Sequence, residues 1–187
     1  KLRVILVNDG SDDDTGYWMD KCAKDFNHDV IHLSENLGKR HSIAKAMEIN
    51  NSEITVLVDS DSALDKYSLV EGLRGFKSPK VSAICGHTDV DNINSSWLTK
   101  MQTQQYFIAF KTFKSLEGFF GSVICCSGAF SMYRTEVIKP LMAEWTTQKF
   151  LGKIRTFGDD RGLTNLLLRD GDDIIYLPDA NARTIVA

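Results

Sequence analysis

The stretch that decides the fold is Val56–Ser62, which reads VLVDSDS. It closes the apolar run Ile54–Val58, a pattern that predicts a buried strand, and Asp59 and Asp61 follow that run directly. Residues two apart in an extended segment point to the same side, so we expect both carboxylates on one face. In open α/β sheets, ligands bind at the carboxyl ends of the strands. Close like charges are costly unless a cation or a donor offsets them, so the stretch predicts a ligand site, with a solvated Asp-Ser turn as the plainer alternative.

The composition is that of a globular protein. The chain has 187 residues, enough for one domain with a substantial core. Its 43% hydrophobic and 25% charged residues exclude an intrinsically disordered protein. A net charge of -3 gives no sign of a nucleic-acid partner. The four cysteines lack zinc-site spacing, which favours reduced thiols, with a disulfide between distant cysteines left open.

Strand and helix patterns alternate three times in the first half of the chain. The apolar runs predict strands at Leu2–Val7, Val30–Leu33, Ile54–Val58 and Val81–Cys85. Helical patterns end near Phe26, cover Arg40–Asn50 and run from about Lys66 to Phe76. This alternation predicts an α/β fold with a mostly parallel central sheet and helices on both faces.

The second half reads differently. Ser95–Leu116 is one long helical candidate, and we expect its apolar side chains, among them Trp97, Met101, Phe107, Ile108 and Phe110, to pack in the core. The Gly- and Cys-rich segment Phe119–Tyr133 looks strand-like, Thr164–Leu168 looks helical, and short strands are expected at Ile174–Leu177 and Thr184–Val186. No linker or repeat divides the sequence, so we expect a single domain over residues 1–187. Both ends lie inside apparent strands, and we therefore expect a part of a longer polypeptide.

Two segments in the first quarter of the chain suit a nucleotide. Asp9 lies in Asn8–Ser11, after the first expected strand, where a carboxylate can accept hydrogen bonds from a base or a ribose; Asp-Gly-Ser is also ordinary turn chemistry. Asn36–Arg40, which reads NLGKR, leads into an expected helix. A glycine, two cations and a helix amino terminus together suit a phosphate, although the P-loop spacing is absent and a solvated basic helix start is the alternative.

Two segments in the second half suit catalysis or acceptor binding. Phe157–Arg161, which reads FGDDR, precedes an expected helix, where the helix dipole and Arg161 can keep the acids ionised. An ionised carboxylate that faces a substrate hydroxyl can act as a general base, and Asp159 can also cap the helix. Cys125–Phe130, which reads CCSGAF, has small residues that let a ligand approach the backbone. A cysteine nucleophile is disfavoured because no protease signature surrounds it.

Taken in order, these segments resemble the processive family 2 β-glycosyltransferases, above all the hyaluronan synthases, chitin synthases and rhizobial chitooligosaccharide synthases. The motifs that carry the resemblance span nearly the whole chain: VNDGSDD, NLGKRHSIAKA, VDSDS, GSVICCSGAFSMYR, QKFLG, FGDDRGLTNLLL and YLPDANARTIV. A lone DxD means little, whereas GKR, DSD, CSG and GDDR in this order are highly specific. The resemblance implies a glycosyltransferase A type fold with a Rossmann-like nucleotide half, a UDP-sugar donor and a divalent metal, Mg²⁺ or Mn²⁺.

The resemblance also implies roles for individual residues. On the donor side, Asp9 contacts uracil, Lys39 lies near the diphosphate, Asp59 lies near the ribose and donor sugar, and Arg161 contributes further binding. Asp61 binds the metal, and Asp160, the last acid of the GDD run, is the catalytic base. The acceptor side is formed by Cys126, Ser127, Gly128 and Asp159.

The implied reaction is an inverting transfer from a UDP-sugar to a growing β-linked polysaccharide of the chitin or hyaluronan type. We expect N-acetylglucosamine as the donor sugar, alone or alternating with glucuronate. The family's first strand, its QxxRW motif and its transmembrane helices are not found in the sequence, and Asn8 stands where aspartate is common. We therefore expect the chain to be part of an integral membrane enzyme whose catalytic domain lies at the cytoplasmic face of the cell membrane.

Two other functions compete with this interpretation. The first is a domain that binds a nucleotide sugar without catalysis, against which the intact Asp61 and Asp160 argue. The second is a phosphatase of the haloacid dehalogenase type, which also places DxD after an apolar strand. That class has Thr or Val where this chain has Ala63, and it places the motif on the first strand rather than the third.

Overall fold

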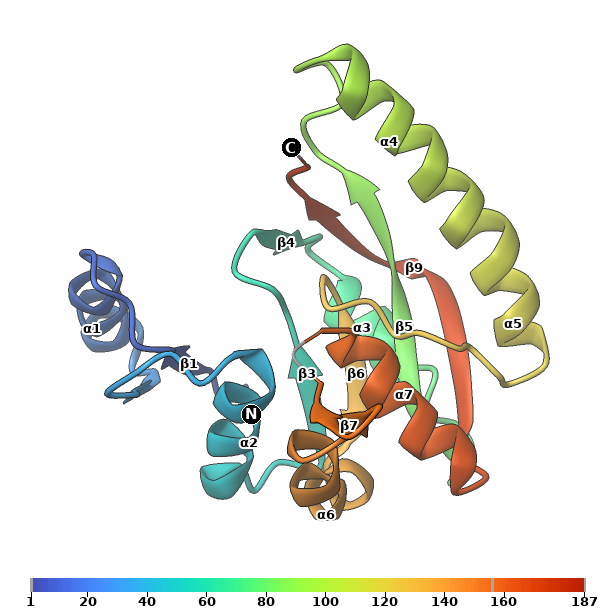
Figure 1. Cartoon of the computed structure of the whole chain (residues 1–187). Coiled ribbons are helices and arrows are strands. Elements are labelled where there is room, and N and C mark those ends of the chain that lie inside the picture. The colour runs from blue at the N-terminus through green and yellow to red at the C-terminus, as the bar shows by residue number, and fades with distance from the viewer. Residues whose placement is uncertain (1, 156, 187) are drawn as a thin grey trace. The chain divides into compact units, whose positions relative to one another are not determined.

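A computed structural model of the chain describes residues 2–155 and 157–186 (Figure 1). The described residues form two compact units. The first unit comprises Lys1–Ser52 and Lys139–Asp159, and the second comprises Glu53–Ile138 and Asp160–Ala187. None of the described helices is long and apolar enough to cross a membrane.

The first unit contains a small parallel sheet with helices beside it. Its sheet pairs β1 (Ile5–Asn8) with β2 (Asp29–His32) in parallel. Its helices are α1 (Thr15–Phe26), α2 (Lys39–Ile49) and most of α6 (Thr135–Thr146), and a hairpin joins β7 (Lys149–Phe150) to β8 (Lys153–Ile154). Asn27 ends α1 in the left-handed conformation, a common helix terminator. The predicted strands and helices of this half are confirmed to within a few residues, whereas α6 was not predicted.

The second unit is built on a five-stranded sheet with the order β3-β6-β5-β9-β4. Its strands are β3 (Ile54–Leu57), β4 (Ser62–Leu64), β5 (Val81–Val90), β6 (Ser131–Arg134) and β9 (Asp173–Thr184). Only β5 and β9 pair in parallel, while β6 runs antiparallel to both β3 and β5, and β4 runs antiparallel to β9. The α/β class is confirmed, but the prediction of a mostly parallel sheet is wrong here. A buried strand has the same apolar run in either direction, so the sequence could not reveal the pairing.

The last strand also differs from its prediction. The strand expected at Ile174–Leu177 lies within the longer strand β9, whereas the strand expected at Thr184–Val186 is wrong except for Thr184, the last residue of β9. Pro178 and Asp179 look like a break in the sequence, but the pairing with β5 continues past them after a register shift between Gly86 and His87. A bulge of this kind absorbs residues that cannot join the ladder.

Helices cover both faces of the five-stranded sheet, as predicted. Gly75, which follows α3 (Ser68–Leu73), lies against the side chain of Leu177, and Gly118 of α5 (Ser115–Phe119) lies against Tyr176. Neighbouring residues of a strand point to opposite faces, so α3 and α5 lie on opposite sides of β9. Figure 1 shows α4 (Trp97–Phe107) and α5 running along β5 and β9.

The long helix predicted for Ser95–Leu116 is interrupted by a π-helix, η1 (Ile108–Lys114), between α4 and α5. Its core assignment is confirmed for Phe110, which is 5% exposed, and wrong for the rest of the apolar row. Trp97 is 77% exposed, and Met101, Phe107 and Ile108 are exposed as well. The helix turns Thr99 and Phe110 inward, and its outward side is also apolar. Hydrophobicity alone does not distinguish the two sides of such a helix.

The segment Phe119–Tyr133 is mostly irregular rather than strand-like. Only its end belongs to a strand, β6, and residues 123–130 form a loop between α5 and that strand. The loop is nevertheless packed, because Val123, Cys126 and Phe130 are fully buried. A buried loop must satisfy its backbone groups, and the partners of these groups define the candidate site.

Candidate functional site

The Asp-Ser-Asp turn follows β3, as the sequence predicts. The Asp59 N–H donates to the carbonyl of Gly128 at 3.0 Å, and the Ser62 N–H donates to the carbonyl of Asp59 at 3.0 Å. Asp61 is exposed at the tip, where Oδ1 accepts from the hydroxyls of Ser62 at 3.1 Å and Thr184 at 3.5 Å. The backbone thus closes a tight turn that leaves the Asp61 carboxylate at the surface and Asp59 half-buried.

The CSG loop and the acid proposed as the base are joined directly. The Gly128 N–H donates to Oδ2 of Asp160 at 2.8 Å. Asp160 lies in the first turn of α7 (Asp159–Arg169), and the Thr164 hydroxyl of the same helix donates to its carbonyl at 2.6 Å. Thr164 Oγ1 also accepts the N–H of Cys126 at 3.0 Å. Two segments that lie far apart in the sequence, at 126–128 and 160–164, are therefore locked together.

These bonds assemble three of the predicted motifs within the second unit. Asp59 bonds to Gly128, and Gly128 bonds to Asp160, so a continuous hydrogen-bond path connects the DSD turn, the CSG loop and the start of α7. Ser127 is half-buried beside this path, and Arg161 is exposed on α7. Asp59, Gly128 and Asp160 therefore belong to one local site, although none of them is near another in the sequence.

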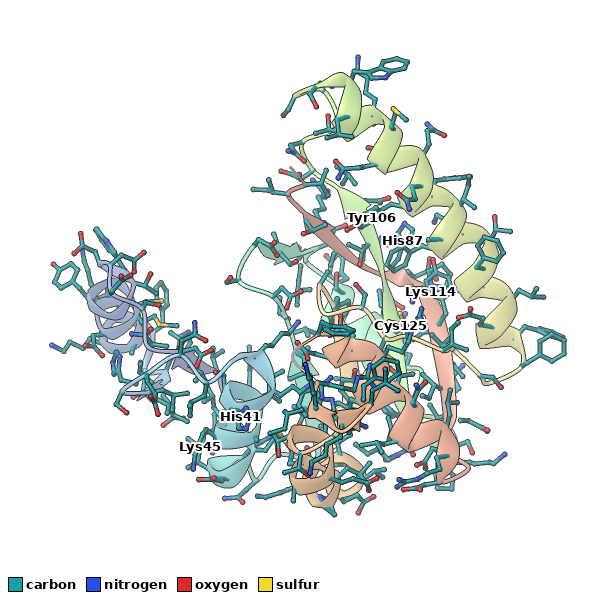
Figure 2. The ribbon with its side chains drawn as sticks, viewed as in Figure 1. His41, Lys45, His87, Tyr106, Lys114 and Cys125 are labelled. Atoms are coloured by element: carbon teal, nitrogen blue, oxygen red, sulfur yellow. The ribbon has the colours of Figure 1, made fainter. Side chains whose placement is uncertain are left out.

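Tyr106 of α4 is a site residue that sequence reasoning missed. Burial raises the pKa of its hydroxyl, and the negative charges of Asp61 and Asp59 raise it further. The ring stacks on Phe110 with centroids 5.9 Å apart. Figure 2 shows Tyr106 on the same side of α4 as His87. We assigned the whole aromatic row to the core; a π-helix directly after Tyr106 is the feature that often marks a functional site, and the sequence does not reveal it.

The buried thiols beneath the CSG loop are unsuited to nucleophilic chemistry. A hydrogen bond from Cys126 lowers the pKa of Cys85 to about 7, helped by Lys114, while the same bond and burial raise the pKa of Cys126. Both side chains are fully buried. The Lys114 ammonium donates to the carbonyl of Cys125, and Figure 2 shows both residues on the side of the helix that faces the sheet. The low preference for a cysteine nucleophile agrees with this burial.

In the first unit, the two segments that suit a nucleotide are joined. Asp9 accepts the N–H groups of Leu37 and Gly38, one on each carboxylate oxygen, both at 2.9 Å. Gly10 packs so closely on the backbone of Glu35 that an added Cβ would lie 2.4 Å from the Glu35 carbonyl carbon. Each Asp9 oxygen keeps a second lone pair for a ligand. Lys39 is half-buried as the first residue of α2.

Arg40 behaves differently from what the sequence predicts. We expected both cations of NLGKR to suit a phosphate, but Arg40 is only 4% exposed. Its Nε donates to Oδ1 of Asp159 at 2.6 Å, and its terminal nitrogens donate to the carbonyls of Trp145 and Phe157, both at 3.1 Å. The N-cap prediction for Asp159 is also wrong, because Asp159 is the first residue of α7 and its carboxylate accepts from Arg40.

The chemistry around Asp61 fits a hard divalent cation in part. Mg²⁺ and Mn²⁺ prefer oxygen ligands, and Asp61 presents an exposed carboxylate. Among residues 2–155 and 157–186, no group of three or more His, Cys, Asp or Glu side chains could hold a metal ion. Asp61 would therefore hold such a cation only together with oxygens from elsewhere, such as the phosphates of a donor substrate.

Comparison with solved structures establishes the fold. A mannosyltransferase from Pyrobaculum calidifontis, solved in complex with GDP-Man and Mn²⁺, matches 100% of this chain and 48% of its own with a TM-score of 0.73 and 18% identity. S. aureus TarS 1-349, solved in complex with UDP, matches 99% of this chain and 51% of its own with a TM-score of 0.70 and 18% identity. The expected glycosyltransferase A fold is confirmed, and the phosphatase alternative is wrong.

Comparison of sequences establishes the family. An N-acetylglucosaminyltransferase of Azorhizobium caulinodans is 35% identical over 99% of this chain and 47% of its own length. The chain spans about half the length of the curated relatives that it matches. The chitin synthase family model matches residues 17–187. The chain, with its DSD, CSG and GDDR motifs on a glycosyltransferase A fold, therefore belongs to the chitin synthase family.

Proposed function

We propose that the protein transfers N-acetylglucosamine from a UDP-sugar to the end of a β-linked, chitin-type oligosaccharide, with inversion at the anomeric carbon. The observation that carries the proposal is the hydrogen-bond path from Asp59 through Gly128 to Asp160. It joins a DxD turn of the kind that meets a nucleotide sugar to a carboxylate placed for acid-base chemistry. The relatives named N-acetylglucosaminyltransferase support the choice of sugar.

Asp160 acts as the general base in this proposal. The Gly128 N–H holds one of its oxygens, which fixes the orientation of the carboxylate. As the acceptor hydroxyl attacks the anomeric carbon, its proton passes to Asp160, the new glycosidic bond forms, and the bond to the UDP oxygen breaks. General-base catalysis of this kind contributes about 10²- to 10⁴-fold to rates. Of the CSG loop, half-buried Ser127 would face the acceptor end, while Cys126 is fully buried and Gly128 is buried, so both support the loop from within.

The proposal gives residues of each unit a role toward the donor. In the first unit, Asp9 receives the uracil and Lys39 lies near the diphosphate. In the second unit, Asp59 lies near the ribose and the donor sugar, and Arg161 contributes further donor binding. Asp61 would hold Mg²⁺ or Mn²⁺, which supplies neutralisation of the charge that builds on the departing diphosphate. The Mn²⁺ in the solved complex of the mannosyltransferase supports a divalent cation.

The protein works at the cytoplasmic face of a membrane in this proposal. The outward side of α4, η1 and α5 supports it, because Trp97, Met101, Ile108 and Leu116 are exposed there. Lys100 and Lys111 are exposed on this stretch, whereas the Lys114 ammonium binds the Cys125 carbonyl and α5 contains the acidic Glu117. An exposed apolar helix with a Trp and basic flanks suits the surface of an anionic bilayer.

The experiment is a product analysis of the full-length protein that carries this chain. Membranes that contain it are supplied with labelled UDP-N-acetylglucosamine, with and without UDP-glucuronate. A chitinase-sensitive product formed without UDP-glucuronate supports the proposal, and a product that requires both donors indicates the hyaluronan-type alternative. Retained UDP binding without any transfer would overturn the proposal in favour of a non-catalytic nucleotide-sugar domain.

A further inference from the structure

Arg40 is a buried cation that none of the functions above uses. Its side chain is 5% exposed, and that of Asp159, its ion-pair partner, is 22% exposed. We propose that Arg40 is a positioning residue for the catalytic base: it fixes the backbone and carboxylate of Asp159, and so sets the place of Asp160 one residue later. This inference rests on the proposed function of Asp160 and adds to it a residue that does not touch substrate.

The first argument is the geometry of the guanidinium. Three nitrogens of Arg40 reach three different acceptors: Oδ1 of Asp159 at 2.6 Å and the carbonyls of Trp145 and Phe157, both at 3.1 Å. The Trp145 ring lies 5.7 Å from the guanidinium carbon. A planar fork with several fixed donors can hold such a set of acceptors, whereas the single ammonium of lysine cannot.

The second argument is that Asp159 is held from two sides. Arg40 binds its carboxylate, and Nε1 of the fully buried Trp145 donates to its carbonyl at 3.1 Å. Arg40 also binds the carbonyl of Phe157, on the other side of Gly158. The turn that enters α7 is therefore fixed at Phe157 and at Asp159, and the left-handed Gly158, with φ at 68°, is enclosed between these two anchors.

The third argument is the cost of the arrangement. A buried ion pair gains little net stability over apolar packing, because both charges lose their hydration. Two nitrogens of this buried guanidinium bind the turn at Phe157 and Asp159, and a third ties that turn to the carbonyl of Trp145 in α6, so the arrangement is better explained by the precision it gives to the turn.

The test compares three variants in the full-length protein. Arg40→Lys keeps the positive charge but removes the several fixed N–H donors of the guanidinium. Asp159→Asn keeps the shape of the side chain but removes its negative charge. Lys45→Gln is the control. Lys45 is an exposed cation on the same helix that pairs with Glu48 at 2.8 Å, and Figure 2 shows it on α2. We expect Arg40→Lys and Asp159→Asn to lower kcat about 10²-fold, the effect of a small misplacement of a catalytic group. The KM for UDP-N-acetylglucosamine should change less than about twofold, and the control should match the parent.

A second readout separates this inference from the proposed function. In a helix, the N–H of Leu163 pairs with the carbonyl of Asp159, so a loosened Asp159 should speed hydrogen exchange at Leu163 and Thr164 in both test variants. Hydrogen exchange can be measured without enzymatic activity, so it tests the positioning role of Arg40 even if the unsubstituted protein transfers no sugar. Unchanged exchange in both folded variants would overturn the inference, as would a raised KM with an unchanged kcat, which would assign Arg40 to donor binding. Should Arg40→Lys fail to fold, the isosteric Asp159→Asn carries the same test.

Discussion

The N–H of Gly128 lies 2.8 Å from Oδ2 of Asp160 and donates a hydrogen bond to it. The carbonyl of the same glycine accepts the N–H of Asp59 at 3.0 Å. One residue of the CSG loop therefore orients the proposed base through its donor and anchors the DSD turn through its acceptor. Both contacts are made by main-chain atoms of Gly128, which is itself buried.

Replacing the proposed base should stop transfer without stopping donor binding. We expect Asp160→Asn to lower kcat by about 10²- to 10⁴-fold, because an amide cannot accept the proton of the acceptor hydroxyl. Binding of UDP, measured by calorimetry, should stay near that of the parent. Asp170→Asn, an exposed acid at the far end of the same helix, is the control. Turnover of Asp160→Asn within about threefold of the parent would remove Asp160 from the mechanism.

Replacing the proposed metal ligand should uncouple nucleotide binding from the cation. Asp61→Ala removes the exposed carboxylate of the DSD turn, so the Mn²⁺-dependent part of UDP binding should disappear in calorimetric titrations with and without Mn²⁺. Asp65→Asn is the control, because Asp65 is an acid of the same region that pairs with Arg183 at 3.2 Å. A metal dependence equal to that of the parent would show that Asp61 is not the ligand.

A methyl group at Gly10 should damage the nucleotide segment more than strain alone predicts. Gly10 has φ at 66°, and an added Cβ would lie 2.4 Å from the backbone of Glu35. Gly10→Ala should therefore displace the amides of Leu37 and Gly38 from Asp9 and weaken UDP binding. Gly171→Ala is a matched control: its φ is 87°, but nothing lies within 4 Å of an added Cβ. The control should lose about 1–2 kcal/mol of stability from the left-handed conformation and keep UDP binding. Equal UDP affinity in both variants would contradict the assignment.

Buried His87 should make the protein less stable in mild acid. It is 2% exposed, accepts from the Tyr176 hydroxyl at Nδ1 at 2.8 Å and lies 3.1 Å from Asp89 at Nε2, an arrangement that satisfies a neutral imidazole. Burial and, to a lesser extent, Lys111 lower its pKa, while Asp89 opposes them. Below the ordinary histidine pKa of about 6.5, the unfolded chain binds a proton that the folded chain resists, so the free energy of unfolding falls as the pH falls.

Denaturant titrations between pH 7.5 and 5 measure this effect. His87→Gln should flatten the dependence of the unfolding free energy on pH, and His41→Gln, at an exposed histidine of α2 shown in Figure 2, should leave it unchanged. An equal slope in His87→Gln and the parent would contradict the prediction.

The exposed apolar stripe on the outward side of α4, η1 and α5 should bind anionic bilayers. In flotation assays, we expect the chain to rise with vesicles that contain phosphatidylglycerol more than with vesicles of phosphatidylcholine alone. Met101→Glu combined with Ile108→Glu should abolish flotation, because both side chains are exposed on the stripe. Leu151→Glu, at an exposed position of the first unit, is the control. Concentration-dependent dimerisation that the same double substitution removes, without flotation of the parent, would instead assign the stripe to a second copy of the chain.

The sequence by itself determined the family and the local elements of this protein. The motifs DSD, CSG and GDDR are runs of neighbouring residues, and apolar periodicity marks a strand such as β3 or a helix such as α1 from local sequence alone. The apolar run Ile54–Val58 likewise predicted that Asp59 and Asp61 would follow a strand, which the structure shows.

Only the tertiary structure decided what those elements do together. In the tertiary structure, β6 lies antiparallel between β3 and β5. Trp97 is exposed and Phe110 is buried, which the sequence could not distinguish because a helix that is apolar on both sides gives no sign of which side meets the sheet. The tertiary structure also shows that the Arg40 side chain is bound to Asp159, 119 residues away in the sequence, and so does not serve as a phosphate-binding cation. Hydrogen bonds and ion pairs between distant segments form only where the fold brings those segments together, and a local sequence pattern carries no information about that.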